Sequence, residues 1–114
     1  MITGAQIILY VTDIDRSRRF YEEIIGLTLT STPSPYWITF DCGGTSLALH
    51  PQDSGDEPLQ LTAIALFTQY LEESRSIFNS RGANFGEIAE PHPGVKFCST
   101  QDPDGTTIFL KPSP

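Results

Sequence analysis

The alternation of apolar and polar positions predicts strands and one helix in the first half of the chain. Residues 4–11 are rich in β-branched and aromatic side chains and are expected to form a strand. A helix should follow, because one apolar face recurs at helical spacing through Ile14, Ser17, Phe20, Tyr21 and Ile24. Thr12 or Asp13 is the expected N-cap, the helix should run to about Ile25, and Gly26 should end it. Three more strands are predicted over residues 27–33, 36–42 and 45–50.

The second half predicts the same order of elements. After a polar linker at residues 51–58, a strand is expected over 60–68 and a helix over about 70–81. Three strands should follow near 84–89, 95–100 and 106–111. Pro91, Pro93 and Gly94 are expected to break the pairing between two of these strands, and the segment from Asp102 to Gly105 to form the last turn. The order is therefore βαβββ twice.

The sequence also repeats itself. When it is shifted by half of its 114 residues, Ile7–Val11 falls on Ile64–Thr68. Gly44–Pro51 matches Gly105–Pro112 at a slightly larger shift. Repeats of 20 to 50 or so residues mark one structural unit used more than once. We expect a single α+β domain, residues 1–114, made of repeats 1–52 and 59–114.

Composition limits the partners. Fourteen acidic residues against seven basic ones give a formal charge of -7, which argues against nucleic acid and suits a cationic ligand if the charge faces the site. No apolar run reaches the roughly 20 residues of a membrane helix, and no export signal is visible, so a cytoplasmic protein is expected. Cys42 and Cys98 lack CxxC spacing and are interpreted as reduced thiols.

Two motifs resemble those of the vicinal oxygen chelate superfamily, which includes glyoxalase I, extradiol dioxygenases, fosfomycin-resistance enzymes and bleomycin-resistance proteins. One runs from Tyr10 through Ser17 to Phe20-Tyr21 and Gly26-Leu27, and the other is the Asp102–Gly105 turn. The resemblance implies that each βαβββ unit forms a half-barrel. It also implies that two such units enclose the site, within one chain or across a swapped dimer, and a homodimer is expected.

Enzymes of that superfamily hold a divalent metal at four positions, one in the first and one in the last strand of each unit. By the resemblance, these positions hold Gln6, Ala48, Ala63 and Phe109 in this sequence. Only Gln6 carries a donor atom, and a neutral amide alone does not hold a divalent cation. Neither a metal nor another cofactor is therefore expected. A relocated site that uses Gln6 and His50 stays open as an alternative.

Strand alternation predicts which side chains face the cavity. If Gln6 does, so do Ile8 and Tyr10, and if Ile38 and Phe40 lie in the core, the next strand adds Trp37, Thr39 and Asp41. Lys111 and Ser46 belong to the same faces by this rule. The predicted ligand-binding residues are Gln6, Ile8, Tyr10, Trp37, Thr39, Asp41, Ala48, His50, Ala63, Phe67, Thr107 and Phe109. Aromatic rings and Asp41 suit a flat or cationic organic molecule, whereas a cavity closed over the rings would leave a packed core.

Three functions follow from these features. The first is a metal-free protein that binds a small organic molecule, similar to bleomycin-resistance proteins. The second is a metal-dependent lyase, isomerase or dioxygenase of glyoxalase type with atypical ligands. The third is a non-catalytic structural or regulatory subunit with a filled barrel. No residue is assigned a catalytic role, because no serine, cysteine or threonine stands in a recognisable motif with a histidine and a carboxylate.

Overall fold

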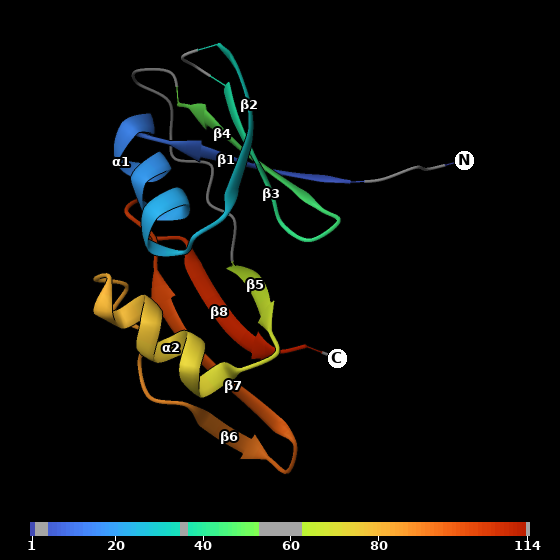
Figure 1. Cartoon of the computed structure of the whole chain (residues 1–114), viewed down its shortest axis with the longest axis vertical. Coiled ribbons are helices and arrows are strands. Elements are labelled where there is room, and N and C mark those ends of the chain that lie inside the picture. The colour runs from blue at the N-terminus through green and yellow to red at the C-terminus, as the bar shows by residue number, and fades with distance from the viewer. Residues whose placement is uncertain (2–4, 35–36, 53–62, 114) are drawn as a thin grey trace. The chain divides into compact units, whose positions relative to one another are not determined.

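A computed structural model describes residues 1, 5–34, 37–52 and 63–113, without the side chains of residues 31–34. The chain divides into two compact units, Met1–Gln60 and Leu61–Pro114 (Figure 1). Most of the predicted linker and the first residues of the strand expected at 60–68 lie outside the described residues.

The first unit is a mixed four-stranded sheet with its helical segment on one face (Figure 1). The strand order is β1-β4-β3-β2, with β1 parallel to β4 and the other neighbours antiparallel. All the elements predicted for this half are present, with ends that differ by a few residues. They are β1 (Gln6–Val11), α1 (Ile14–Arg19), η1 (Phe20–Ile24), β2 (Thr28–Ser34), β3 (Trp37–Asp41) and β4 (Ser46–Pro51).

The helical segment begins as predicted but does not stay α-helical. Asp13 is its N-cap, and its Oδ1 accepts a hydrogen bond from the backbone N–H of Arg16 at 3.1 Å. The last turn is the π-helix η1, in which the Ile25 N–H donates to the Phe20 carbonyl at 3.0 Å. The prediction of one α-helix to Ile25 is wrong in this turn, because the hydrogen bond spans five residues rather than four. Gly26 follows with a φ of 84°, the left-handed conformation predicted for the helix end.

The core of the first unit lies between the sheet and its helical segment. Alternate residues of β1 and β3 point into it, as the sequence predicted, and the Tyr21 and Phe40 rings lie 6.4 Å apart there. Consecutive strand residues point to opposite faces, so this packing fixes which side chains the other face carries. The buried apolar residues of the core are Leu9, Val11, Phe20, Tyr21, Ile25, Ile38, Phe40, Leu47 and Leu49, and Ala48 is also buried but belongs to the opposite face of the sheet.

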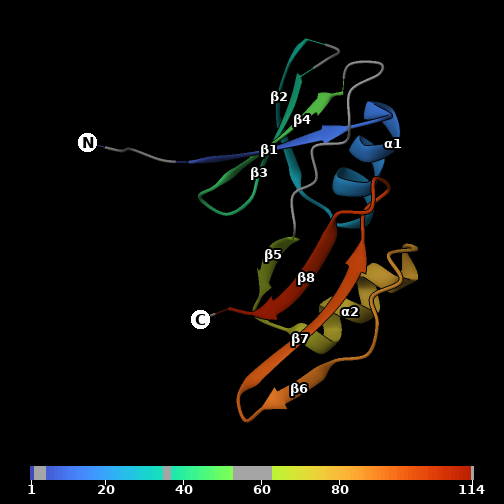
Figure 2. The same ribbon diagram turned by 180° about the vertical axis from the view of Figure 1, so that it is seen from behind.

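The second unit repeats this topology. Its strand order is β5-β8-β7-β6, with β5 parallel to β8, and α2 lies on one face of the sheet (Figures 1 and 2). The repeat found in the sequence is therefore also a repeat of structure. In the part of the chain that the structure describes, no helix is long and apolar enough to cross a membrane. The elements are β5 (Ala63–Thr68), α2 (Leu71–Ser80), β6 (Ala89–His92), β7 (Val95–Gln101) and β8 (Thr107–Pro112).

The strand predicted near 84–89 is wrong, since residues 83–88 form an irregular segment and β6 begins at Ala89. Side chains of α2 form hydrogen bonds with backbone groups of this segment that would pair with a neighbouring strand if the segment were a strand. Asn79 accepts from the Phe85 N–H at 2.6 Å and donates to the Phe85 carbonyl at 3.0 Å. The Arg75 guanidinium donates to the Gly86 carbonyl at 2.6 Å. These side-chain bonds, together with one backbone bond from the Gly86 N–H to the Ser99 carbonyl of β7 at 3.0 Å, take the place of a regular ladder.

The interruption of strand pairing that was predicted at Pro91, Pro93 and Gly94 is limited to the turn at Pro93 and Gly94. β6 runs through Pro91 and pairs with β7 as a hairpin in which His92 lies opposite Val95. Proline is tolerated there because β6 is an edge strand. The turn itself contains Gly94, whose φ of 80° favours glycine.

Candidate functional site

Three cross-strand rows of side chains cover the face of the first sheet that lies opposite the helical segment, hereafter the first open face. Each row takes one residue from β1, one from β4 and one from β3, in the observed register. This is the arrangement predicted from strand alternation. The rows are Tyr10, His50 and Trp37; Ile8, Ala48 and Thr39; and Gln6, Ser46 and Asp41.

The first row is made of rings. The His50 imidazole lies 5.7 Å from the Tyr10 ring and 5.3 Å from the Trp37 ring, both in edge-on geometry. His50 Nδ1 lies 2.7 Å from the Pro51 carbonyl oxygen, which can only accept, so this nitrogen carries the proton. Tyr10 is 40% exposed, and its ring therefore offers surface on which a flat molecule could stack.

The other two rows differ in how much surface they offer. Ile8 is 36% exposed, whereas Ala48 is fully buried and Thr39 nearly so. Ala48 and Thr39 thus share the predicted face but present little or no surface to a ligand. In the third row, the Gln6 amide donates to the Ser46 hydroxyl at 2.9 Å and the Asp41 side chain is exposed.

The second sheet has an equivalent face, hereafter the second open face. Its rows are built from β5, β8 and β7 in the same register. The Phe97 and Phe109 rings lie 5.5 Å apart, edge to face, which places both on this side of the sheet. Phe97 was not predicted as a site residue, although its alternation with buried Cys98 could have indicated its direction. The rows are Ala63, Thr107 and Gln101; Ala65, Phe109 and Ser99; and Phe67, Lys111 and Phe97.

The residues at the superfamily's metal positions do not fit a divalent metal. Alanine and phenylalanine have no donor atom, and the amide nitrogen of Gln6 already bonds Ser46. Gln6 and His50 are not brought together either, because they lie in rows four residues apart, about 13 Å along the strands. Among the described residues, no group of three or more His, Cys, Asp or Glu side chains could hold a metal ion. No metal-dependent step is derived for this chain.

The thiol beside the third row should react slowly. Burial raises the pKa of Cys42, and the neighbouring Asp41 carboxylate raises it further. The thiolate is the nucleophile, so alkylation by iodoacetamide at neutral pH is expected to be slower than for free cysteine. Asp41→Asn should speed the reaction about two- to threefold, since an exposed carboxylate acts through solvent. Peptide mapping by mass spectrometry would separate Cys42 from Cys98.

Asp15→Asn is the matched control for this experiment. Asp15 is exposed in the first turn of α1, and its substitution removes the same charge as Asp41→Asn. It should leave the alkylation rate of Cys42 unchanged. A Cys42 rate equal to that of free cysteine would contradict the expected thiol environment.

A family model and several solved structures of other proteins are similar to this chain. The model of the Glyoxalase/Bleomycin resistance protein/Dioxygenase superfamily matches residues 4–110. TnmS3, an antibiotic binding protein from Streptomyces sp. CB03234, is 22% identical with a TM-score of 0.83, over 100% of this chain and 98% of that one. Lactoylglutathione lyase from Agrobacterium tumefaciens is 17% identical with a TM-score of 0.79, over 99% and 95%.

A glyoxalase/bleomycin resistance protein from Streptomyces sp. CB03234 is 24% identical with a TM-score of 0.77, over 96% of this chain and 99% of that one. At these identities the likeness concerns the fold. No curated protein matches the sequence significantly. The family match spans both repeats and both of the motifs that suggested the relationship. The chain therefore belongs to the Glyoxalase/Bleomycin resistance protein/Dioxygenase superfamily.

Proposed function

We propose that this chain is a metal-free small-molecule-binding protein of its superfamily and that it holds an aromatic or cationic organic ligand against its open faces. The observation that carries the proposal is the row of three rings formed by Tyr10, His50 and Trp37 on a sheet face that no helix among the described residues of its unit covers. Ligand sites are commonly apolar and aromatic with a few polar groups. The first open face has this composition.

Charge supports a cationic group on the ligand. Asp41 lies on the same face as the rings and is exposed. Along β3, Trp37 and Asp41 are four residues apart, about 13 Å. A molecule that stacks on the first row and reaches this carboxylate is therefore an elongated one, with fused or linked rings and a cationic end. Aromatic faces attract such a cation as well.

Other site residues follow from the rows. Gln6 and Ile8 extend the contact area on β1, and Ala63, Phe67, Thr107 and Phe109 are proposed as ligand contacts of the second open face itself. The printed description of TnmS3 as an antibiotic binding protein is consistent with a binding role for this fold. The donor-poor residues at the metal positions favour binding over metal-dependent catalysis in this chain.

A thermal-shift screen with cationic aromatic compounds tests the proposal. One ligand class should stabilise the protein by several degrees, and calorimetry should then show about tenfold weaker binding for Trp37→Ala, because an aromatic contact is lost. Trp37→Phe should keep most of the affinity, which separates loss of stacking from misfolding.

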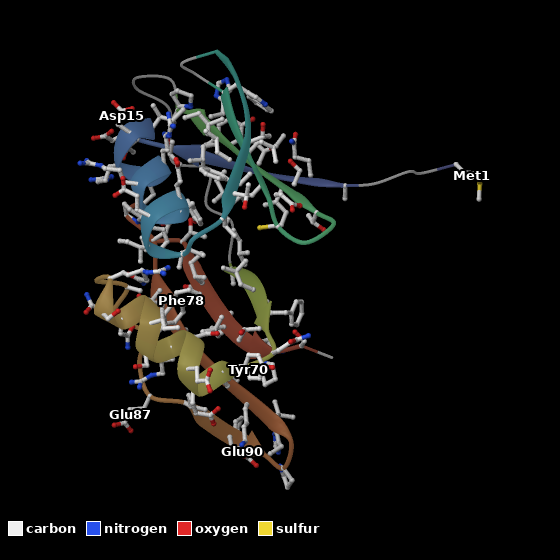
Figure 3. All side chains as sticks on the ribbon, viewed as in Figure 1. Met1, Asp15, Tyr70, Phe78, Glu87 and Glu90 are labelled. Atoms are coloured by element: carbon white, nitrogen blue, oxygen red, sulfur yellow. The ribbon has the colours of Figure 1, made fainter. Side chains whose placement is uncertain are left out.

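Tyr70→Ala is the matched control, since Tyr70 is a 64% exposed aromatic residue at the start of α2 and outside the rows (Figure 3). Its affinity should equal that of the unmodified protein. Equal affinities for Trp37→Ala and Tyr70→Ala would contradict the assignment of the site.

A further inference from the structure

The row of the second open face that is equivalent to the ring row of the first has the same chemical order. In the first sheet, a basic-type residue on the central strand, His50, stands between Tyr10 and Trp37. In the second sheet, Lys111 of β8 pairs with Phe67 of β5, and continuing the Cys98–Leu110 register by one residue places Phe97 of β7 on its other side. Both rows thus have a basic residue between two aromatic ones, with a lysine in the second row where the first has a histidine.

In the described part of the chain, no carboxylate forms an ion pair with Lys111. Lys96 pairs with Glu90 at 3.6 Å, and Arg18 pairs with Glu22 at 2.9 Å. Over residues 63–113 and the described parts of the first unit, no ion pair involves Lys111. This is unexpected in a chain with twice as many acidic as basic residues.

Apolar surface surrounds this charge. Phe67 is 59% exposed, and it is the immediate cross-strand neighbour of Lys111, on strands about 4.8 Å apart. Lys111 and Phe97 are partly buried. An anion interacts more strongly with an ammonium group beside apolar surface than with one in open solvent.

We propose that the second open face is a binding site for an aromatic carboxylate, with the carboxylate on Lys111 Nζ and the aromatic ring on Phe67. This inference rests on the proposed function and adds the ligand chemistry of the second unit. The first open face offers a carboxylate, Asp41, to a cation, and the second offers an ammonium group to an anion. The two faces of the duplicated unit therefore select ligand groups of opposite charge.

Calorimetric titration with three naphthalene probes tests the site: naphthoate, naphthalenemethanol and naphthylmethylammonium. The unmodified protein should bind naphthoate about fivefold more tightly than the neutral alcohol, whereas binding of the cation, which suits the first open face, should be no weaker in Lys111→Met. Lys111→Met should abolish the preference for naphthoate while retaining weak binding of the alcohol. Lys111→Arg should keep the preference. Because the contact is partly exposed, the preference should shrink as salt is raised.

Lys96→Met is the matched control, because Lys96 belongs to β7 but pairs with Glu90 on β6 and alternates with Phe97, so it lies on the other face. It removes the same charge and should leave naphthoate binding unchanged.

Equal affinity for all three probes in the unmodified protein and Lys111→Met would overturn the inference while leaving a binding face. Failure of every probe to bind would overturn both the inference and the proposed role of this face. If a second copy of the chain covers Phe67, then Phe67→Ser would reduce the oligomeric state and naphthoate would not bind, which also overturns it.

Discussion

Replacing Phe40 by alanine is expected to lower the free energy of unfolding by about 3 to 5 kcal/mol. Phe40 is fully buried in β3 and its ring lies 6.4 Å from that of Tyr21 in the core of the first unit. The substitution removes the apolar contacts of the ring and leaves a cavity that the sheet can only partly close. Since small proteins are stable by about 5 to 15 kcal/mol, the loss should be a large fraction of the total.

Urea denaturation followed by circular dichroism measures this loss. Phe67→Ala is the matched control, because the same atoms are removed from a ring that is 59% exposed on the second open face. Its cost should stay below about 1 kcal/mol. If both variants unfolded at the same urea concentration, the assignment of Phe40 to the core and of Phe67 to the surface would be refuted.

Replacing Asp102 by alanine is expected to cost about 2 kcal/mol, the second largest effect. Asp102 is buried in the turn before β8, and its Oδ1 accepts from the backbone N–H groups of Asp104 and Thr106 at 2.9 and 2.8 Å. Alanine leaves both donors without this acceptor in a partly buried turn. Gly105 completes the turn with a φ of 85°, where a side chain would be strained.

Asp102→Asn is the informative comparison, since its amide oxygen can still accept both hydrogen bonds. The loss for asparagine should be well under half of that for alanine in the same urea titration. Equal losses for the two variants would mean that charge rather than hydrogen bonding stabilises the turn. The equivalent turn of the first unit needs no such residue, because it is built on Gly43 and Gly44 and closed by the Cys42 N–H donating to the Thr45 carbonyl at 2.7 Å.

Strand alternation and the internal repeat predicted much of the fold. The two patterns together assigned the direction of Tyr10, Trp37 and His50, because a strand has only two faces and one must pack on the helix. The π turn at Phe20 and the irregular segment at 83–88 were not predictable in this way. Both depend on which of several donors and acceptors pair in three dimensions, as the Asn79 side chain shows by bonding both backbone groups of Phe85.

The sequence predicted which face of the sheet the side chains of the candidate site point to, but not how much of their surface is exposed. Alternation places Ala48 and Thr39 on the first open face, between neighbours in the adjacent strands, yet Ala48 is fully buried and Thr39 nearly so. Accessibility depends on the size and direction of those neighbours, which the periodicity of one strand does not contain. The sequence likewise placed Lys111 on its face but gave no sign that it lacks an ion pair in the described structure, because pairing is decided between strands.

Calorimetric titration of the chelator-treated protein, with the metal content of the same sample measured by mass spectrometry, tests the central claim most directly. The titrant is the cationic aromatic compound that gives the largest thermal shift. Binding without metal that weakens about tenfold in Trp37→Ala is the result we predict. Stoichiometric divalent metal in the untreated protein, together with loss of ligand binding after chelation, would contradict the account.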